Sequence, residues 1–170
     1  MIVIVSGPPG SGKTTLARRL APLLQLQLIS KDDIKETLFD NLGWSDREWS
    51  KQLGAATWEV LWTLLGRAAG SGASVIVESN FHTEHRARVA ALGGEVIEVH
   101  CTARPDTLVR RFRERDRHPG HVDADIVIED AQALLDMHQP VTERVIHVDT
   151  EDPDAIDVDG IVRQIREADS

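Results

Sequence analysis

The chain has 170 residues, of which 41% are hydrophobic and 28% charged, and its formal net charge is −9 with neutral histidines. This composition excludes a disordered protein, and the length fits one domain that can bury a core without disulfides or a structural metal. An acidic surface repels nucleic-acid backbones and anionic lipids, which argues against a general nucleic-acid coat or a membrane-surface protein. The single cysteine, Cys101, excludes an intrachain disulfide, and we expect a cytoplasmic protein without a secretion signal or membrane span.

Five short apolar segments alternate with segments of helical pattern. The expected strands cover residues 2–5, 26–29, 74–78, 96–101 and 144–148. A first helix is expected from residue 13, with loosening at Pro22, and further helices over residues 31–39, 45–69 and 84 to about 93. Another begins at residue 105, one runs from Asp123 or Asp125 to about 138, and the last covers residues 157–167. Ser45 and Glu48 have the spacing of a capping box at the start of the long helix. This order predicts an α/β fold with a five-stranded parallel sheet and helices on both faces.

A glycine-rich motif follows the first expected strand. Residues 7–14 read Gly-Pro-Pro-Gly-Ser-Gly-Lys-Thr, which fits the pattern G-x-x-x-x-G-K-[ST] between a strand and a helix. Glycines let backbone N–H groups wrap a phosphate, Lys13 can reach the β- and γ-phosphates, and the Thr14 hydroxyl can bind Mg²⁺. The alternative is a turn that merely joins strand to helix, but the complete motif favours ATP with Mg²⁺. The predicted ATP-binding residues here are Gly7, Pro9, Gly10, Ser11, Gly12, Lys13, Thr14 and Thr15.

The rest of the sequence favours a kinase over other proteins that carry this motif. It contains no N-K-x-D-like motif, which a GTPase needs to read guanine, and it is shorter than motor ATPases. A cluster of arginines predicts a lid over residues 110–122, where the arginines would stabilise charge on the moving phosphoryl group. The alternative is a solvated helix whose arginines pair with Glu114 and Asp116. The arginines of the cluster are Arg110, Arg111, Arg113, Arg115 and Arg117.

Two aspartates, Asp32 and Asp33, follow the second expected strand. A kinase that acts on an alcohol needs a carboxylate that orients the hydroxyl group and accepts its proton, and one of these two is well placed for that role. Capping of the helix that begins here explains the aspartates equally well. The residues by themselves leave both interpretations open.

These segments together resemble the P-loop kinases related to the kinase domain of phage polynucleotide kinase. Zeta-toxin and chloramphenicol phosphotransferase are similar relatives in this group. The resemblance rests on residues 7–14, 30–35 and 75–80 and on the arginine cluster, and it runs over nearly the whole chain. It implies a P-loop NTPase fold like that of nucleoside monophosphate kinases. It also implies that Arg115 contacts the ATP phosphates and that Arg111 lies beside the adenine.

The resemblance assigns further roles on the acceptor side. It implies that Asp32 is the general base and that Lys35, Asn80 and Arg86 bind the substrate. Lys35 stands where the family has an arginine, which keeps the charge but loses bidentate geometry. Glu78 stands where the family has an aspartate.

The implied function is transfer of the γ-phosphoryl group of ATP to a hydroxyl group, with Mg²⁺ as the metal ion. We expect a single domain over residues 1–170, with Lys13, Asp32 and Arg115 as catalytic residues. We expect a small polar acceptor, such as a sugar, a nucleoside or an antibiotic. One alternative is a kinase for the 5′-hydroxyl of DNA or RNA, which needs a basic channel. Another, of a different class, is a nucleotide-binding regulatory module with weak ATPase activity. The residues that could form the channel are Lys31, Lys35, Arg47, Lys51 and Arg86.

Overall fold

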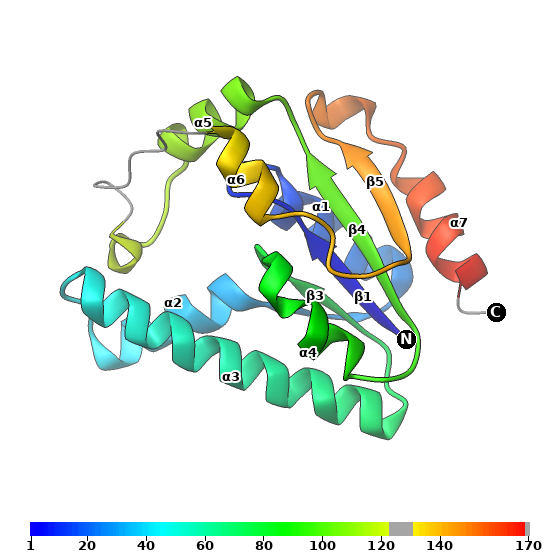
Figure 1. The fold of residues 1–170 in the computed structure, drawn as a ribbon, viewed down its shortest axis with the longest axis horizontal. Coiled ribbons are helices and arrows are strands. Elements are labelled where there is room, and N and C mark those ends of the chain that lie inside the picture. The colour runs from blue at the N-terminus through cyan, green and yellow to red at the C-terminus, as the bar shows by residue number, and fades with distance from the viewer. Residues whose placement is uncertain (123–130, 169–170) are drawn as a thin grey trace.

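The computed structural model describes residues 1–122 and 131–168 and contains a five-stranded sheet (Figure 1). The strands are β1 (Ile2–Ser6), β2 (Gln27–Ser30), β3 (Val75–Glu78), β4 (Val96–Thr102) and β5 (Val145–Asp149). All neighbouring strands are parallel, and their order across the sheet is β2-β3-β1-β4-β5. This confirms the predicted α/β fold and places β1 in the centre, where all of its residues are buried.

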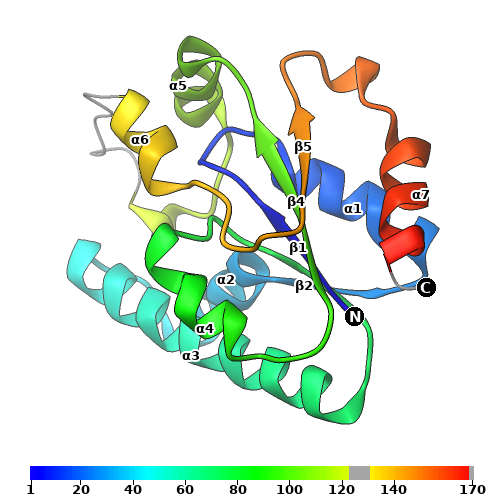
Figure 2. The same ribbon diagram turned by 45° about the vertical axis from the view of Figure 1, so that its right-hand side comes forward.

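Helices cover both faces of the sheet, as Figures 1 and 2 show. The helices are α1 (Lys13–Leu24), α2 (Lys31–Leu42), α3 (Arg47–Ser71), α4 (Arg86–Ala90), α5 (Pro105–Glu114), α6 (Ala131–Met137) and α7 (Val158–Ala168). Successive side chains of a strand point to opposite faces. Val3 and Val5 of β1 therefore pack against α1 and α7, while Ile2 and Ile4 pack against α3 and α4.

The parallel arrangement brings several connections to one edge of the sheet. The segments that follow β1, β2, β3 and β4 all leave from the carboxyl ends of the strands, where ligands bind in open α/β sheets. A 3₁₀ turn at Pro119–His121 follows α5. The expected helix start at Asp123 or Asp125 lies outside the described residues. Among the residues that are described, none of the helices combines the length and the apolar character needed to cross a bilayer.

The start of α3 differs from the predicted capping box. The helix begins at Arg47, and Asp46 is its N-cap residue, with Oδ1 accepting a hydrogen bond from the backbone N–H of Trp49 at 2.8 Å. An aspartate caps as well as the neighbouring Ser45 would and adds a negative charge at the positive end of the helix. The expectation for Pro22 also needs correction, because α1 continues through this residue. Pro22 lies in the last turn, where its missing N–H removes only one hydrogen bond.

We expect Asp46→Ala to lower the free energy of unfolding by about 1 kcal/mol, because it removes the side chain that caps α3. Ser45→Ala is the matched control, and as an exposed residue outside the cap it should change that free energy by less than about 0.5 kcal/mol. Urea unfolding followed by circular dichroism measures both variants. Equal losses in the two variants would contradict the assignment of Asp46 as the cap.

Candidate active site

The loop of residues 7–12, between β1 and α1, has a backbone shape that favours glycine. Gly7 has a φ angle of +138° and Gly10 a φ angle of +85°. A Cβ atom on Gly7 would overlap the carbonyl oxygen of Cys101 in β4, and one on Gly10 would lie 2.6 Å from the carbonyl oxygen of Leu108 in α5. The loop is therefore packed tightly against β4 and α5, and this packing determines its path at the edge of the sheet.

The junction of this loop with α1 offers groups that suit an anion. Gly12 is the N-cap residue of α1, so no side chain caps these N–H groups, and no acidic residue occupies the first turn. The Lys13 Nζ lies 3.5 Å from the carbonyl oxygen of Pro8, above the loop. The Ser11 hydroxyl is buried and has no hydrogen-bond partner among the described residues. Since helix-start N–H groups and a buried hydroxyl both require partners, the loop fits a phosphate chain.

The phosphate loop is the name used here for the motif of residues 7–14, which includes the start of α1. Glu78, the last residue of β3, connects this phosphate loop to α2. Its carboxylate accepts hydrogen bonds from Thr14 Oγ1 at 3.1 Å and from Ser30 Oγ at 2.9 Å, and the side chain is buried. Ser30 is the N-cap residue of α2, and its Oγ accepts a hydrogen bond from the Asp33 N–H at 3.4 Å. Burial lowers the pKa of Lys13, and the Glu78 carboxylate nearby opposes that shift. One buried carboxylate therefore sets the position of α2 relative to the loop.

Asp32 lies in the first turn of α2 and is surrounded by cations. Arg117 donates a hydrogen bond to its Oδ2, and the Lys31 Nζ lies 4.0 Å from its Oδ1. Burial would raise the pKa of Asp32, but the charges of Arg117 and Lys31 outweigh burial and hold that pKa below its ordinary value. Asp33 is exposed instead and pairs with Arg18 at an N–O distance of 3.4 Å. Of the two aspartates, Asp32 is therefore the one that lies beside the phosphate loop, with its pKa lowered by neighbouring cations.

The five arginines of the predicted lid point in different directions. Arg111, in α5, donates hydrogen bonds of 3.0 and 3.1 Å to the backbone carbonyl groups of residues 150 and 151, beyond β5. Arg115 and Arg117 follow α5 and turn toward the phosphate loop and α2. Two others are exposed, namely Arg110 and Arg113. The cluster is therefore divided, with Arg110 and Arg113 facing solvent and Arg115 and Arg117, which follow the end of α5, lining the space beside the phosphate loop.

The segment after α5 is docked on α2 by aromatic and polar contacts. The His118 ring stacks on Phe39, with ring centres 5.3 Å apart, and its Nε2 lies 3.1 Å from Asp40 Oδ1. The Nε2 of His121 lies 2.9 Å from Glu36 Oε1, and burial lowers the pKa of this histidine. These contacts hold the arginine that precedes His118 against the start of α2.

A cavity of about 220 Å³ lies between the phosphate loop, α2, the start of α3 and the docked segment. It brings predicted catalytic and substrate-binding residues into one space. The predicted residues that line it are Pro9, Lys13, Asp32, Lys35, Asn80 and Arg115. Further basic residues in its wall are Lys31, Arg47, Lys51 and Arg117. Four of the five residues named as a possible basic channel thus share this cavity with the phosphate loop.

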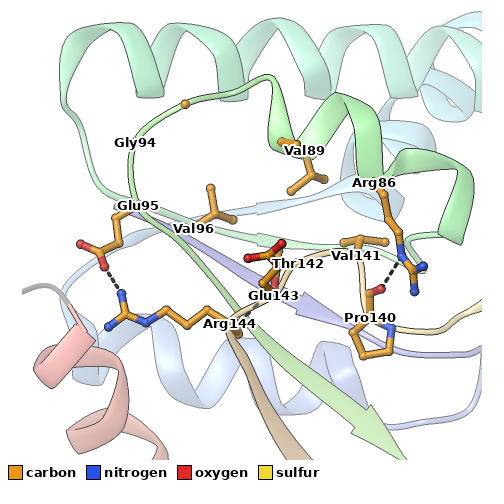
Figure 3. Close-up of a pocket in the computed structure, with 12 residues that line it drawn as sticks. Arg86, Val89, Gly94, Glu95, Val96, Pro140, Val141, Thr142, Glu143 and Arg144 are labelled. Carbon is orange, nitrogen blue, oxygen red and sulfur yellow. Dashed lines mark hydrogen bonds and ion pairs between the residues drawn. The ribbon is translucent and has the colours of Figure 1, made fainter.

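Arg86 does not join this cavity. Its Nε donates a hydrogen bond of 2.9 Å to the Pro140 carbonyl group, and it lines a separate cavity of about 810 Å³ (Figure 3). That cavity also contains the Glu95–Arg144 ion pair and lies near the residues that precede β4 and β5. It is the larger of the two, yet the phosphate loop and α2 contribute nothing to its lining. The structure therefore places Arg86 apart from the predicted substrate-binding residues Asp32, Lys35 and Asn80, which share the smaller cavity.

Two contacts of the site do not follow from the sequence. Thr14 and Glu78 meet because β3 lies beside β1, and the only signal in the sequence is that each follows or ends an apolar strand. Arg117 meets Asp32 because the segment after α5 folds back onto α2. The arginine cluster itself marks that segment, but it does not show which arginine reaches the carboxylate.

Comparisons with known proteins agree with this fold. A family model described as an AAA domain matches residues 2–141. A solved structure from Chloroflexus aurantiacus j-10-fl, described as that of a proposed kinase, is 38% identical and has a TM-score of 0.87 over 98% of this chain and 97% of that chain. A gluconokinase from Sinorhizobium meliloti 1021 is 21% identical and shares the fold, with a TM-score of 0.56 over 98% of this chain and 89% of that chain.

Three curated relatives are much longer than this chain. Uncharacterised proteins of Mycobacterium bovis and Mycobacterium tuberculosis are 31% identical over 126 residues, which is 67% of this chain and 25% of each relative. The chain thus spans about a quarter of the length of these relatives. The family model covers most of the chain, and the Chloroflexus structure matches nearly all of it. The chain therefore belongs to the AAA domain family.

Proposed function

We propose that this protein is a P-loop kinase that transfers the γ-phosphoryl group of ATP to a hydroxyl group of a small acceptor. The observation that carries the proposal is the shared cavity, in which Lys13 of the phosphate loop, Arg115 of the predicted lid and the Asp32 carboxylate face one space. A phosphoryl donor and an alcohol must meet in such a space, with cations on one side and a carboxylate on the other.

The nucleotide would lie along the loop of residues 7–12. Backbone N–H groups at the start of α1 and the buried Ser11 hydroxyl would bind its phosphates. Lys13 and Arg115 would stabilise the charge on the phosphoryl group as it moves. Arg111, which contacts the backbone after β5, would form part of the base-binding side.

The residues around Thr14 fit a Mg²⁺ ion. This ion takes oxygen ligands and is usually held by one or two carboxylates together with substrate phosphates. Thr14 Oγ1 and the Glu78 carboxylate, 3.1 Å apart, supply such oxygens beside Lys13. These two side chains would hold the ion, either directly or through water. When bound, Mg²⁺ neutralises charge on the phosphates.

Asp32 would act on the acceptor. Its carboxylate accepts the proton of the acceptor hydroxyl group while that oxygen forms a bond to the γ-phosphorus and the bond from phosphorus to the ADP oxygen breaks. The charges of Arg117 and Lys31 lower the pKa of Asp32, so its carboxylate carries no proton at neutral pH and can accept a hydrogen bond from the acceptor hydroxyl group. The products are ADP and the phosphorylated acceptor.

Asp32→Asn should lower kcat by about 10²–10⁴-fold, because the amide can no longer accept the proton. Its dissociation constant for ATP should stay within about threefold of wild type, since Asp32 contacts no part of the phosphate loop in the proposed arrangement. Steady-state turnover with an accepted alcohol and calorimetric titration of ATP measure the two quantities.

Asp33→Asn is the matched control, because Asp33 is the adjacent carboxylate and pairs with Arg18 at the surface. It should retain nearly full activity. The general-base role of Asp32 is contradicted by an Asp32→Asn enzyme that keeps more than about a tenth of wild-type activity.

Glu78→Gln should raise the free Mg²⁺ concentration for half-maximal turnover by about tenfold or more, because the variant removes a carboxylate that orients or ligates the ion. Turnover measured as a function of free Mg²⁺ tests this, and thermal unfolding shows whether the variant is folded. Ser30→Ala is the control, since it removes the other hydrogen bond to Glu78 and leaves the carboxylate in place. The Mg²⁺ role fails if a folded Glu78→Gln enzyme has the Mg²⁺ dependence of wild type.

A further inference from the structure

One face of α3 forms a wall of the cavity that contains Asp32. The residues of α3 in this wall are Arg47, Ser50, Lys51 and Gly54. Residues three and four positions apart lie on the same face of a helix, so this spacing is that of one continuous face. The first three residues extend side chains from the face, whereas Gly54 has none. The cavity therefore reaches the backbone of α3 at Gly54.

The fold itself does not require a glycine at position 54. The residue lies inside α3, and it is not among the glycines with a positive φ angle. A Cβ atom on Gly54 would lie 3.5 Å from the Lys35 Nζ and 3.6 Å from the Lys35 Cε, and it would meet no other described atom outside α3 within 4 Å. These are ordinary van der Waals distances. An alanine therefore fits at this position without a shift of Lys35 or of α2.

A glycine inside a helix is also unfavourable, because it loses more conformational freedom on folding than an alanine does. Gly66, further along α3, has the same disadvantage, but it is exposed, and a Cβ atom there would meet nothing within 4 Å. It contributes nothing to the described lining of the cavity. A side chain at position 66 would extend into solvent, whereas one at position 54 would extend toward Lys35, which also lines the cavity.

The space beside Gly54 is the space in which the acceptor would lie. Asp32, which would accept the proton of the acceptor, and Lys13 of the phosphate loop line the same cavity. Its volume is about 220 Å³, which is the liquid volume of about seven water molecules. In a space this small, an acceptor that fills the cavity is sensitive to a single added methyl group.

We propose that Gly54 sets the size of the acceptor. The bare backbone of α3 at this position admits a polyhydroxy alcohol that extends from Asp32 toward α3, and a side chain there would limit the cavity to shorter alcohols. The inference rests on the kinase function proposed above. The Asn80 amide in the lining suits such an alcohol, because it can both donate and accept hydrogen bonds.

Phosphoryl transfer to a graded series of alcohols tests the proposal. Labelled ATP is supplied with glycerol, erythritol, ribitol or glucitol, each longer than the one before by one hydroxymethylene group. For Gly54→Ala we expect kcat/KM for the longest alcohol that wild type accepts to fall by about tenfold or more, because one methylene group in a filled pocket is worth about 10–200-fold. The value for the shortest accepted alcohol should stay within about threefold of wild type. Gly54→Leu should shift the limit to still shorter alcohols.

Gly66→Ala is the matched control, because it makes the same replacement in the same helix at a position outside the described lining of the cavity. It should keep the wild-type preference among the alcohols. Both alanine variants should raise the melting temperature by about 2–4 °C, since alanine stabilises the interior of a helix relative to glycine. A narrower preference in a Gly54→Ala enzyme of higher melting temperature cannot come from a damaged fold.

The outcomes separate this inference from the proposed function. Transfer by wild type with an unchanged preference in both Gly54 variants overturns the role of Gly54 and leaves the kinase function standing. An equal loss for every alcohol also overturns that role, because a residue that sets size must discriminate by length.

Absence of transfer from ATP to any alcohol by wild type contradicts the proposed function. Calorimetric titration of the ADP-saturated enzymes with glucitol then decides the inference. Binding to wild type that is lost in Gly54→Leu supports the role of Gly54, and any other result overturns it.

Discussion

The buried Glu78 carboxylate is the contact on which the arrangement of the site depends. It accepts hydrogen bonds from Thr14 at the start of α1 and from Ser30 at the start of α2, and Ser30 in turn accepts one from the backbone of α2. A carboxylate removed from water must have such donors, because an unpaired buried charge is costly. The same bonds that stabilise Glu78 thus set the distance between the residue that would hold the donor phosphate and the carboxylate that would activate the acceptor.

Charge is distributed unevenly in this protein. The whole chain carries a net charge of −9, whereas the walls of the candidate site contain lysines and arginines from the phosphate loop, α2, α3 and the segment after α5. A concave site lined by one sign of charge focuses the field toward ligands of the opposite sign. The acidic chain as a whole repels polyanions at long range, whereas the lysines and arginines of the cavity wall attract the phosphates of a nucleotide at short range.

The segment after α5 links the two sides of this site. His118 stacks on Phe39, and the Gly120 backbone packs so closely on the same ring that a Cβ atom at this position would lie 2.7 Å from it. Ser50 of α3 donates a hydrogen bond of 3.4 Å to the His121 carbonyl group. These contacts involve both α2 and α3, which supply lysines and an arginine of the cavity wall. Docking of the segment and formation of the acceptor side of the cavity are therefore parts of one packing arrangement.

The parallel sheet and the phosphate loop were predictable because their signals are local. Ile2 to Val5 are apolar on both faces, as a central strand requires, and the motif of residues 7–14 specifies its turn by glycine positions alone. The cap of α3 was harder to predict, since Ser45 and Asp46 are adjacent candidates of similar capping strength.

The sequence by itself determined which chemical groups are available: a phosphate-binding loop, a carboxylate after the second strand and a cluster of arginines over residues 110–117. Tertiary structure alone decided which of these groups meet. Glu78 bonds a residue 64 positions away, Arg117 reaches across 85 positions to Asp32, and Arg86 turns to a different cavity. The physical reason is that strand order and helix packing are settled by burial over the whole chain, whereas motif spacing records only neighbours in sequence.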